Sequence, residues 1–348
     1  RLFFSLYMAA RNLPGSLAIA ALLTCAVFST ASGIVGAVVT LMGLLAYPAM
    51  ANAGYNRSFA SGVICAGGTL GILIPPSVVL AVYGYITEQD VGVLFIAGIV
   101  PGIIAIAMYM LAVRLAYGRR LPAGEPFRLG EAVRSLSGVW AVMLLFLLII
   151  GSIYFGITTA TEAAAVGSFL TALIGIVRGR LNARLLLDSL VEALRTSVAI
   201  YTILIGAILF GYFLAITQSP QKITAWLVAL DLGAYGTLAL ILVFFVIMGC
   251  ILDAMAMIIL LVPIVFPIIT QLGFDPIWFG VIMVIVLELG LITPPIGLNV
   301  FVINSMAGDV PMSETFRGVV PFLISDCVRV GLLIAFPTLT LILPKLLS

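Results

Sequence analysis

Long apolar runs, separated by short polar or charged segments, make up most of this chain. Most runs are near the roughly 20 residues that a helix needs to cross a bilayer. They lack the alternation that a transmembrane β-barrel strand shows. The pattern therefore predicts an all-α polytopic membrane protein. Uninterrupted crossings are expected at 92–116, 136–157, 160–177, 198–217 and 319–345.

Two further apolar runs are divided by small or polar residues. In residues 16–50 the break is the run from Ser29 to Gly33, and each half is too short to span. This predicts a re-entrant hairpin with its tip at 29–36. Residues 235–270 show the same pattern and predict a second hairpin, with its tip at 249–253.

Each hairpin is followed by a crossing that is interrupted at a double proline. Residues 57–86 contain a glycine-rich run at 67–71 and then Pro75-Pro76, so we expect this helix to be broken across 67–77. Residues 276–303 are expected to be broken at 288–297, around Pro294-Pro295. Proline stops a preceding helix and removes a backbone donor, so these prolines are interpreted as geometry rather than as ligands.

The two hairpin-plus-broken-helix units are related by a shift of 219 residues. The shift superimposes Pro48 on Pro267, Gly54 on Gly273, Gly71 on Gly290, Pro75 on Pro294, Pro76 on Pro295 and Asp90 on Asp309. With one more residue inserted, Gly98 meets Gly318 and Pro101 meets Pro321. A series in register indicates two copies of one unit.

Five crossings lie between the two hairpins, and an odd number predicts that the second copy is inverted. Inverted repeats with interrupted helices are typical of secondary transporters. The predicted division is a first repeat at 1–117, connecting scaffold helices at 118–217 and a second repeat at 218–348. Amphipathic stretches at 1–13 and 184–197 are expected to lie along the membrane interface.

Composition supports a membrane protein: 63% of the 348 residues are hydrophobic, 9% are charged, and the mean hydropathy is +1.30. A soluble or a disordered protein would carry far more charge. Histidine is absent, which argues against a His-based metal site or catalytic pair, and an enzyme is not expected. The four cysteines lack metal-type spacing and are interpreted as small core residues.

The basic residues lie mostly on one side of the predicted topology, which should be cytoplasmic. That side receives Arg1, Arg11, Arg57, Arg114, Arg119, Arg120, Arg128, Arg134, Arg178, Arg180, Arg184, Arg195 and Arg317. Lys222 and Lys345 fall on the opposite side. Arg329 falls inside the last helix, three residues after Asp326, and an ion pair between them is the expected explanation.

Backbone that is not helical at membrane depth must be satisfied by something other than lipid. A break frees carbonyl oxygens, which suit a hard monovalent cation such as sodium, and helix N-ends, which suit an anion. We therefore expect two sodium sites with an anionic substrate between them. The first site is assigned to Ser29, Thr30, Ser32, Gly68, Thr69 and Gly71. The alternative for each Ser or Thr is a hydrogen bond to its own helix.

The second sodium site is assigned to Gly249, Asp253, Gly290, Thr293 and Gly297. The substrate region is assigned to Ser32, Gly33, Ser77, Thr293 and Asn299. Asp253 and Glu288 are the acids expected to lie deepest in the membrane. A carboxylate there is costly unless paired, so each is a functional candidate. The alternative is a hydrogen bond that holds the break in shape.

Four segments resemble the large membrane subunit of TRAP transporters, the tripartite ATP-independent periplasmic systems. They are Gly68-Thr69-Leu70-Gly71-Ile72-Leu73-Ile74-Pro75-Pro76-Ser77, the run from Leu94 to Gly102, the run from Gly156 to Ala165, and Gly290-Leu291-Ile292-Thr293-Pro294-Pro295-Ile296-Gly297 followed by Pro321-Phe322. The resemblance extends over essentially the whole chain.

The resemblance implies a sodium-driven importer of organic anions, usually carboxylates, with an elevator motion like that of the ion-transporter superfamily. It implies two partners, a small four-helix membrane subunit and an extracytoplasmic binding protein, in a bacterial or archaeal inner membrane. No cofactor other than Na⁺ as coupling ion, and no nucleic acid, is expected. The alternative is a sodium–dicarboxylate symporter of similar architecture that needs no binding protein.

The chain departs from the family pattern in two places. Many members carry Gly-Ser-Ser at the first hairpin tip, whereas Gly33 is followed here by Ile34-Val35. Backbone carbonyls are then expected to supply more of the first site. The family's large subunit also has more crossings before the amphipathic arm, so the chain is expected to begin part-way through a longer protein.

Overall fold

The computed structural model describes residues 2–32, 35–118, 140–218, 222, 232–307 and 310–347, and no strand occurs among them. Within these ranges, seven helical segments are long and apolar enough to cross a membrane. The predicted all-α polytopic membrane class is therefore confirmed. The division into three domains stays a prediction.

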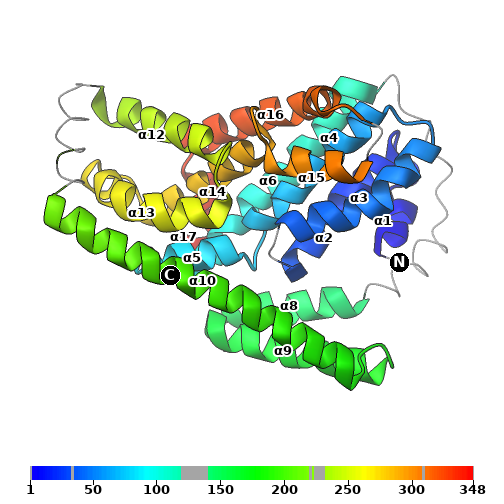
Figure 1. Ribbon diagram of the computed structural model, residues 1–348, viewed down its shortest axis with the longest axis horizontal. Coiled ribbons are helices and arrows are strands. Elements are labelled where there is room, and N and C mark those ends of the chain that lie inside the picture. The colour runs from blue at the N-terminus through cyan, green and yellow to red at the C-terminus, as the bar shows by residue number, and fades with distance from the viewer. Residues whose placement is uncertain are drawn as a thin grey trace.

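The N-terminal third follows the predicted order of arm, hairpin, broken helix and crossing (Figure 1). Its helices are α1 (Leu2–Ala10), α2 (Ser16–Ser32), α3 (Val35–Asn52), α4 (Arg57–Leu73), α5 (Val78–Thr87) and α6 (Val91–Tyr117). The predicted tip at 29–36 coincides with the end of α2 and the start of α3. Residues 33 and 34 between them lie outside the described residues.

Three helices in the middle of the chain lie along one side of the remaining structure (Figure 1). They are α8 (Trp140–Tyr154), α9 (Ala160–Val177) and α10 (Ala183–Thr217). Helix α9 has the predicted bounds. The prediction of a separate amphipathic stretch at 184–197 and a crossing at 198–217 was wrong, because α10 is one continuous helix. No Gly or Pro interrupts residues 183–205, so nothing in the sequence stops that helix at 197.

The C-terminal third repeats the order of the first. Its helices are α12 (Gly233–Gly249), α13 (Ala254–Gln271), α14 (Pro276–Ile292), α15 (Leu298–Ala307), α16 (Met312–Ala335) and α17 (Thr338–Leu347). The prediction of one last crossing at 319–345 was wrong, because it is divided between α16 and α17. Pro337 explains the division, since a proline lacks an N–H and disfavours a helical conformation in the residue before it.

Helix bounds in the two thirds recur at nearly constant spacing. Helices α4 and α14 have 17 residues each and begin and end 219 residues apart. Helices α3 and α13 have 18 residues each and are also 219 apart at both ends. The N-caps correspond as well, because the Asn56 side chain accepts from the Phe59 N–H and the Asp275 side chain from the Trp278 N–H. The inverted orientation of the two units in a membrane stays a prediction.

The two broken helices form the centre of the packed structure. Every residue of α4 from Phe59 to Leu73, and every residue of α14 from Trp278 to Ile292, is buried. Helices α4 and α14 also contact each other. Because both helices are hydrophobic all round, neither has a polar face that would place it at a surface.

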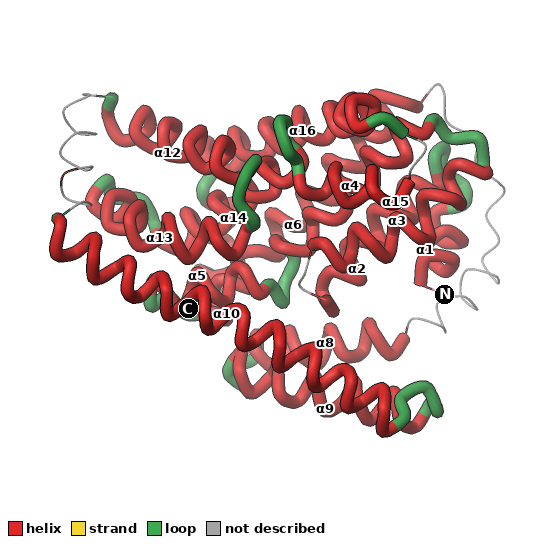
Figure 2. The backbone as a smooth tube through the Cα atoms, viewed as in Figure 1, coloured by secondary structure: helices red, strands yellow, loops and turns green. Residues whose placement is uncertain are grey.

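The two units interlock through their hairpins (Figure 2). The second arm of the first hairpin, α3, packs against α15, which follows the break of the other unit. The second arm of the second hairpin, α13, packs against α5 in the same way. Each helix that follows a break therefore packs against a hairpin arm of the other unit.

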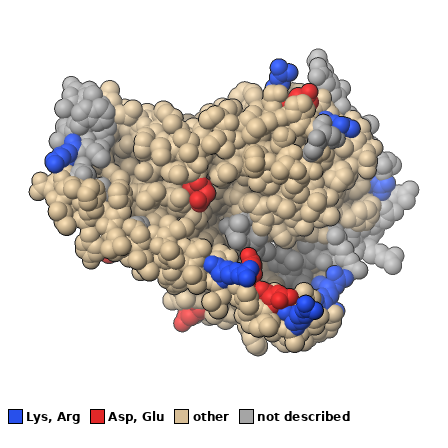
Figure 3. All heavy atoms as spheres, viewed as in Figure 1, with Lys and Arg blue, Asp and Glu red and all other residues tan. Residues whose placement is uncertain are grey.

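The surface of the described residues carries few charges and many apolar side chains. In the view of Figure 3, most surface atoms belong to uncharged residues, and several of the charged groups lie near the rim. Large apolar side chains are exposed over the length of α10, among them Leu209, Tyr212 and Ile216. A soluble protein rarely exposes such a continuous apolar surface, whereas lipid covers it in a membrane protein.

Candidate functional site

The first break occupies residues 74–77 and leaves two carbonyls at the end of α4 without their helical donors. In a continuous helix, Gly71 and Ile72 would accept from the N–H groups of residues 75 and 76, but both are prolines. The Ser77 hydroxyl donates to the Ile72 carbonyl instead. It also accepts from the Leu80 N–H at 3.2 Å and so caps α5.

The second break occupies residues 293–297 and shows the same chemistry. Prolines at 294 and 295 remove the donors that Gly290 and Leu291 would use. The Thr293 N–H donates to the Gly290 carbonyl at 3.2 Å, closing the last turn of α14. Gly297 has φ +56, a left-handed conformation that favours glycine. Both X-Pro bonds, 75–76 and 294–295, are cis.

The two breaks differ in how far they are covered. At the first break, Pro75 and Ser77 are buried, and α6 approaches so closely that a Cβ atom on Gly98 would lie 2.9 Å from the Leu73 carbonyl oxygen. At the second break, Pro294 and Pro295 are exposed. Among the described residues, the second break is therefore the more accessible one.

The tip of the second hairpin contacts the helix that leads to the second break. A Cβ atom placed on Gly290 would lie 2.6 Å from the Cα atom of Gly249, and one placed on Gly249 would lie 3.1 Å from the Cα atom of Gly290. The two backbones can approach this closely only because both residues are glycines. The structure thus brings together two residues assigned to the second sodium site.

The residues assigned to the first site are placed less completely. Ser29, Thr30 and Ser32 lie in the last turns of α2, but their side chains, and all of Gly33, lie outside the described residues. The Thr69 hydroxyl donates to the Ala66 carbonyl at 2.8 Å, which is the alternative that we considered for such residues. A ligand role for these residues stays a prediction.

The predicted break across 67–77 was too long at its N-terminal end, because Gly67, Gly68 and Gly71 lie inside α4. These glycines serve close packing instead. A Cβ atom on Gly67 would lie 2.9 Å from the Cys25 Sγ atom of α2, and one on Gly68 would overlap the Val39 side chain of α3. The glycine-rich run therefore lets both hairpin arms approach α4. The expected break across 288–297 was too long for the same kind of reason, since Glu288 and Gly290 are helical in α14.

Of the remaining second-site residues, Asp253 lies at the tip of the second hairpin, directly before α13. Its carboxylate is exposed and caps α13, accepting from the N–H groups of Met255 and Ala256 at 2.8 and 3.2 Å. A helix start offers an acid free N–H donors, and the depth of Asp253 in the membrane stays a prediction. The Thr293 hydroxyl, at the break itself, donates to the Leu289 carbonyl at 2.6 Å.

Asn299, assigned to the substrate region, lies at the start of α15 and joins the two units. Its side-chain amide donates to the Cys65 carbonyl of α4 at 3.1 Å, and the Asn299 side chain is buried. The Cys65 thiol in turn lies 3.5 Å from the Asn299 carbonyl. Asn299 and Ser77 thus have a visible structural use, and their contact with a substrate stays a prediction.

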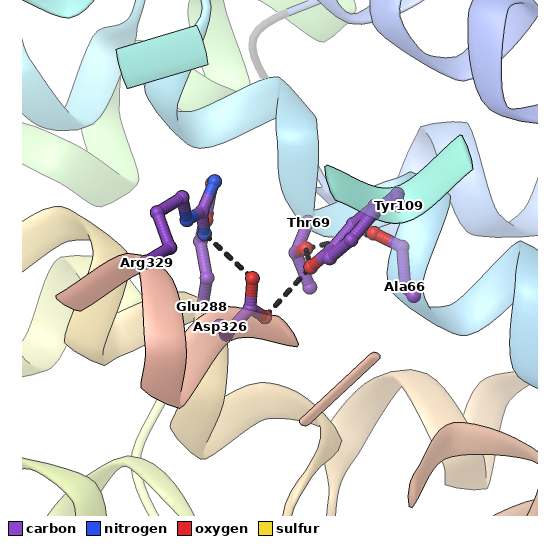
Figure 4. Close-up of polar contacts among 6 residues, drawn as sticks. All are labelled: Ala66, Thr69, Tyr109, Glu288, Asp326 and Arg329. Carbon is purple, nitrogen blue, oxygen red and sulfur yellow. Dashed lines mark hydrogen bonds and ion pairs between the residues drawn. The ribbon is translucent and has the colours of Figure 1, made fainter. Parts of the chain in front are cut away.

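A buried polar cluster lies between the two broken helices, and the site assignment from the sequence did not include most of it (Figure 4). The Arg329 guanidinium of α16 contacts Glu288 of α14 at 2.5 Å and Asp326 at 2.9 Å. The Tyr109 hydroxyl of α6 donates to the other Asp326 oxygen at 2.7 Å and lies 3.4 Å from the Thr69 hydroxyl. The predicted pair of Asp326 and Arg329 is confirmed.

All five side chains of this cluster are completely buried. Two carboxylates and one guanidinium away from water are tolerated only when they pair with one another. The i, i+3 spacing identified Asp326 and Arg329 from the sequence. Glu288 and Tyr109 were not identifiable as their partners, because 41 and 217 residues separate them from Arg329 and Asp326, respectively.

The chain matches the family described as "Tripartite ATP-independent periplasmic transporter, DctM component" over residues 4–339. A relative from Pseudomonas aeruginosa, the C4-dicarboxylate TRAP transporter large permease protein DctM, is 38% identical over 97% of this chain and 79% of its own length. The sialic acid TRAP transporter large permease protein SiaM of Vibrio cholerae is 32% identical over 96% of this chain and 79% of its own length.

Among solved structures, the YdaH transporter of Alcanivorax borkumensis has a similar fold, with a TM-score of 0.64 and 17% sequence identity, over 97% of this chain and 85% of that one. The sequence relatives are permease subunits of transporters rather than enzymes. The resemblance inferred from the glycine–proline motifs is thereby confirmed. The chain belongs to the DctM family, the large permease component of the tripartite ATP-independent periplasmic transporters.

Proposed function

We propose that this chain is the transport subunit of a sodium-coupled, binding-protein-dependent importer of organic anions, with carboxylates as the substrate class. The two relatives above are named for a C4-dicarboxylate and for sialic acid, which are both carboxylates. The single observation that supports the proposal most is the pair of helix breaks at the packed centre. Each break leaves one carbonyl, that of Gly71 or of Leu291, without the donor that a continuous helix would supply.

Sodium is the proposed coupling ion because the freed groups at both breaks are uncharged backbone oxygens. Such oxygens are ligands for hard cations. Among the described residues, no group of three or more His, Cys, Asp or Glu side chains is placed to hold a metal ion. A monovalent cation of low charge density is therefore the more fitting occupant. At the first site we propose the Gly71 carbonyl, already assigned above, as a backbone ligand, and at the second site we add the Leu291 carbonyl.

The anionic substrate is proposed to bind near the N-ends of α5 and α15, which both begin at a break. The N–H groups of a first helical turn have no partner within their own helix and favour negative charge. Sodium at the neighbouring carbonyls adds positive charge at the same place. The site would then attract a carboxylate without a permanently charged side chain, which membrane depth disfavours.

The proposed system includes a small four-helix membrane subunit and an extracytoplasmic binding protein, in the inner membrane of a bacterium or archaeon. The proposed motion is of elevator type. The hairpins and broken helices move as one unit, since α3 and α13 each pack across onto the other repeat. Helices α8, α9 and α10 would belong to the stationary part.

The proposal is tested by uptake into proteoliposomes that contain the assembled transporter. The binding protein is loaded with a radiolabelled organic acid and added outside, with an inward gradient of sodium, potassium or protons. We expect uptake only with the sodium gradient and only with the binding protein present. Equal uptake with potassium would refute sodium coupling. Uptake of free substrate without the binding protein would instead support the sodium–dicarboxylate symporter, which family membership does not favour.

The site assignment is tested with bulky apolar replacements at the two tips and breaks. We expect Thr293→Leu and Ser32→Leu to abolish sodium-dependent uptake while the protein still inserts into the membrane. Thr202→Leu is the matched control. Like the Thr293 hydroxyl, the Thr202 hydroxyl donates to a carbonyl of its own helix, that of Val198, but it lies on the exposed face of α10. Full uptake by both site variants would contradict the assignment.

A further inference from the structure

We infer that the buried cluster of Tyr109, Asp326, Arg329 and Glu288 couples the two ion sites, so that occupation of one break favours occupation of the other. This inference rests on the sodium coupling proposed above. The four are positioning residues, since none of them is assigned to contact an ion or the substrate. Their proposed role is to fix how α4 and α14 lie relative to each other.

The cluster forms one continuous series of contacts between the two broken helices (Figure 4). It begins at Thr69 of α4, whose hydroxyl oxygen contacts the Tyr109 hydroxyl at 3.4 Å while donating its own proton to the Ala66 carbonyl. It continues through the hydrogen bond of 2.7 Å that Tyr109 donates to Asp326. It passes over 2.9 Å to Arg329 and over 2.5 Å to Glu288 of α14. A shift of α14 against α4 would therefore lengthen at least one of these contacts.

Both ends of the series lie close to the predicted sites. Thr69 is itself assigned to the first sodium site and precedes Gly71 by two residues. Glu288 precedes Gly290, which contacts the tip of the second hairpin at Gly249, by the same two residues. A cation bound at the end of α4 or of α14 orders that helix end. Because the cluster joins α4 to α14, this ordering also affects the other helix.

The members of the cluster occupy equivalent positions in the two repeats. Thr69 and Glu288 are 219 residues apart, the spacing that superimposes the double prolines. Tyr109 and Arg329 are 220 apart, the spacing that superimposes Gly98 on Gly318. Each repeat therefore contributes the same two positions, one on the broken helix and one on the following helix. The cluster lies where the two repeats meet.

Asp326 breaks this symmetry and links the two halves. Its counterpart in the first repeat is the apolar Ile106, so only one carboxylate of this kind is present. One of its oxygens accepts from Tyr109 of the first repeat and the other contacts Arg329 of the second. Without Asp326, the pair of Thr69 and Tyr109 and the pair of Glu288 and Arg329 would have no polar connection through the contacts described here.

Because the cluster is buried, its contacts are sensitive to small displacements of the helices. Completely buried groups are out of contact with bulk water, so bulk solvent does not replace a contact that is stretched. Four polar atoms of the cluster already lack a hydrogen-bond partner among the described residues, namely Glu288 Oε1, Asp326 Oδ1, Arg329 Nε and Arg329 Nη1. Loss of a contact with Arg329 would leave a buried carboxylate unpaired, which is expensive. Intermediate positions of the broken helices, in which these contacts are stretched, are therefore costly, and this favours the discrete arrangements that coupling between sites requires.

The test uses Tyr109→Phe, which removes one hydroxyl and keeps the ring packed against Phe322. Tyr83→Phe is the matched control. The Tyr83 hydroxyl is also buried and also donates across the repeats over 2.7 Å, but to the Pro276 carbonyl at the far end of α14 from the break. Both variants lose a hydrogen bond of equal length, and only Tyr109→Phe interrupts the series.

The measured quantity is the sodium dependence of uptake at saturating binding protein. We expect wild type and Tyr83→Phe to share a Hill coefficient above unity. In Tyr109→Phe the coefficient should fall toward unity, and the sodium concentration for half-maximal uptake should rise about 5-fold or more, the lower end of typical site-to-site coupling. An equal loss in both variants would show a merely structural effect and overturn the inference. So would an unchanged coefficient in Tyr109→Phe.

The outcome separates this inference from the function that it rests on. Absence of sodium dependence in wild type would refute the proposed function. Sodium-dependent uptake with a Hill coefficient of unity in wild type would leave that function intact and overturn the coupling. Asp326→Asn provides a second variant, since the amide keeps the size of the side chain. It should lower the coefficient as Tyr109→Phe does, and a retained wild-type coefficient would count against the inference.

Discussion

Gly249 and Gly290 bring the tip of the second hairpin and the end of α14 into direct backbone contact, with 2.6 Å between the Gly249 Cα atom and any Cβ atom placed on Gly290. Neither backbone can move aside without displacing a helix. The hairpin tip therefore has a fixed position next to the last turn before the break. This contact marks the position of the proposed second sodium site more narrowly than the polar side chains around it do.

The first prediction concerns this contact. Gly290→Ala should push the hairpin tip away from α14 and abolish sodium-dependent stabilisation of the protein. The cost to folding is expected to be about 1–3 kcal/mol, as for other overpacked cores. Thermal unfolding in detergent, with sodium or potassium chloride, measures both effects. Gly331→Ala in α16 is the control, because a Cβ atom there meets nothing within 4 Å. Sodium-dependent stabilisation at the wild-type level in Gly290→Ala would contradict the prediction.

A second prediction follows from the pairing of Arg329 with two buried carboxylates. Arg329→Met should leave Glu288 and Asp326 without their cation and destabilise the protein by about 3–5 kcal/mol, as removal of one partner of a buried ion pair does. The thermal unfolding midpoint of the purified protein provides the measurement.

Arg195→Met serves as the matched control for that experiment. Arg195 lies 4.0 Å from Glu192 on the exposed surface of α10, where both side chains are about three-quarters exposed. Exposed pairs contribute little to stability, so the midpoint should barely change. A similar drop in both variants would mean that burial is not what makes the Arg329 pair important.

Local pattern was sufficient to predict those parts of the fold that depend on nearby residues. Helix α9 begins after the capping residue Thr159 and has the predicted bounds, and both double prolines end a helix. The pair of Asp326 and Arg329 was equally visible, because i, i+3 residues share a helix face. These features need no knowledge of how helices pack.

Other features depended on packing and could not be read from the sequence. A glycine at position 67 or 68 can either end a helix or let a neighbouring helix approach closely. The positions of Cys25 and Val39 against these glycines show that they allow close packing. Asp253 caps the start of α13, and the apolar residues on either side of it in the sequence did not indicate that role. The partners of Arg329 beyond its own helix depend on tertiary structure alone.

A third prediction concerns Asn299, which joins α15 to α4. Asn299→Ala should remove the hydrogen bond to the Cys65 carbonyl and destabilise the protein by about 1 kcal/mol. Asn304→Ala, a half-buried position on the same helix, is the control. If Asn299 also contacts the substrate, the variant should in addition need more loaded binding protein for half-maximal uptake. An unchanged unfolding midpoint would show that the bond to Cys65 contributes nothing.

The fourth prediction concerns Ser77, whose hydroxyl serves both sides of the first break. Ser77→Ala should remove the cap of α5 and the donor to the Ile72 carbonyl together, at a cost of about 2 kcal/mol, which is the sum of a lost cap and one lost hydrogen bond. Ser77→Thr retains a hydroxyl and should recover part of that stability. Ser305→Ala in α15 is the control, because its exposed hydroxyl bonds only its own helix, at the Val302 carbonyl. The midpoint of thermal unfolding should therefore fall in the order Ser305→Ala, Ser77→Thr, Ser77→Ala.

Since the Ile72 carbonyl lies between the proposed sodium ligands and the start of α5, Ser77→Ala should also weaken sodium-dependent stabilisation. If the variant lost stability but kept the full sodium effect, the Ser77 hydroxyl would serve the fold alone.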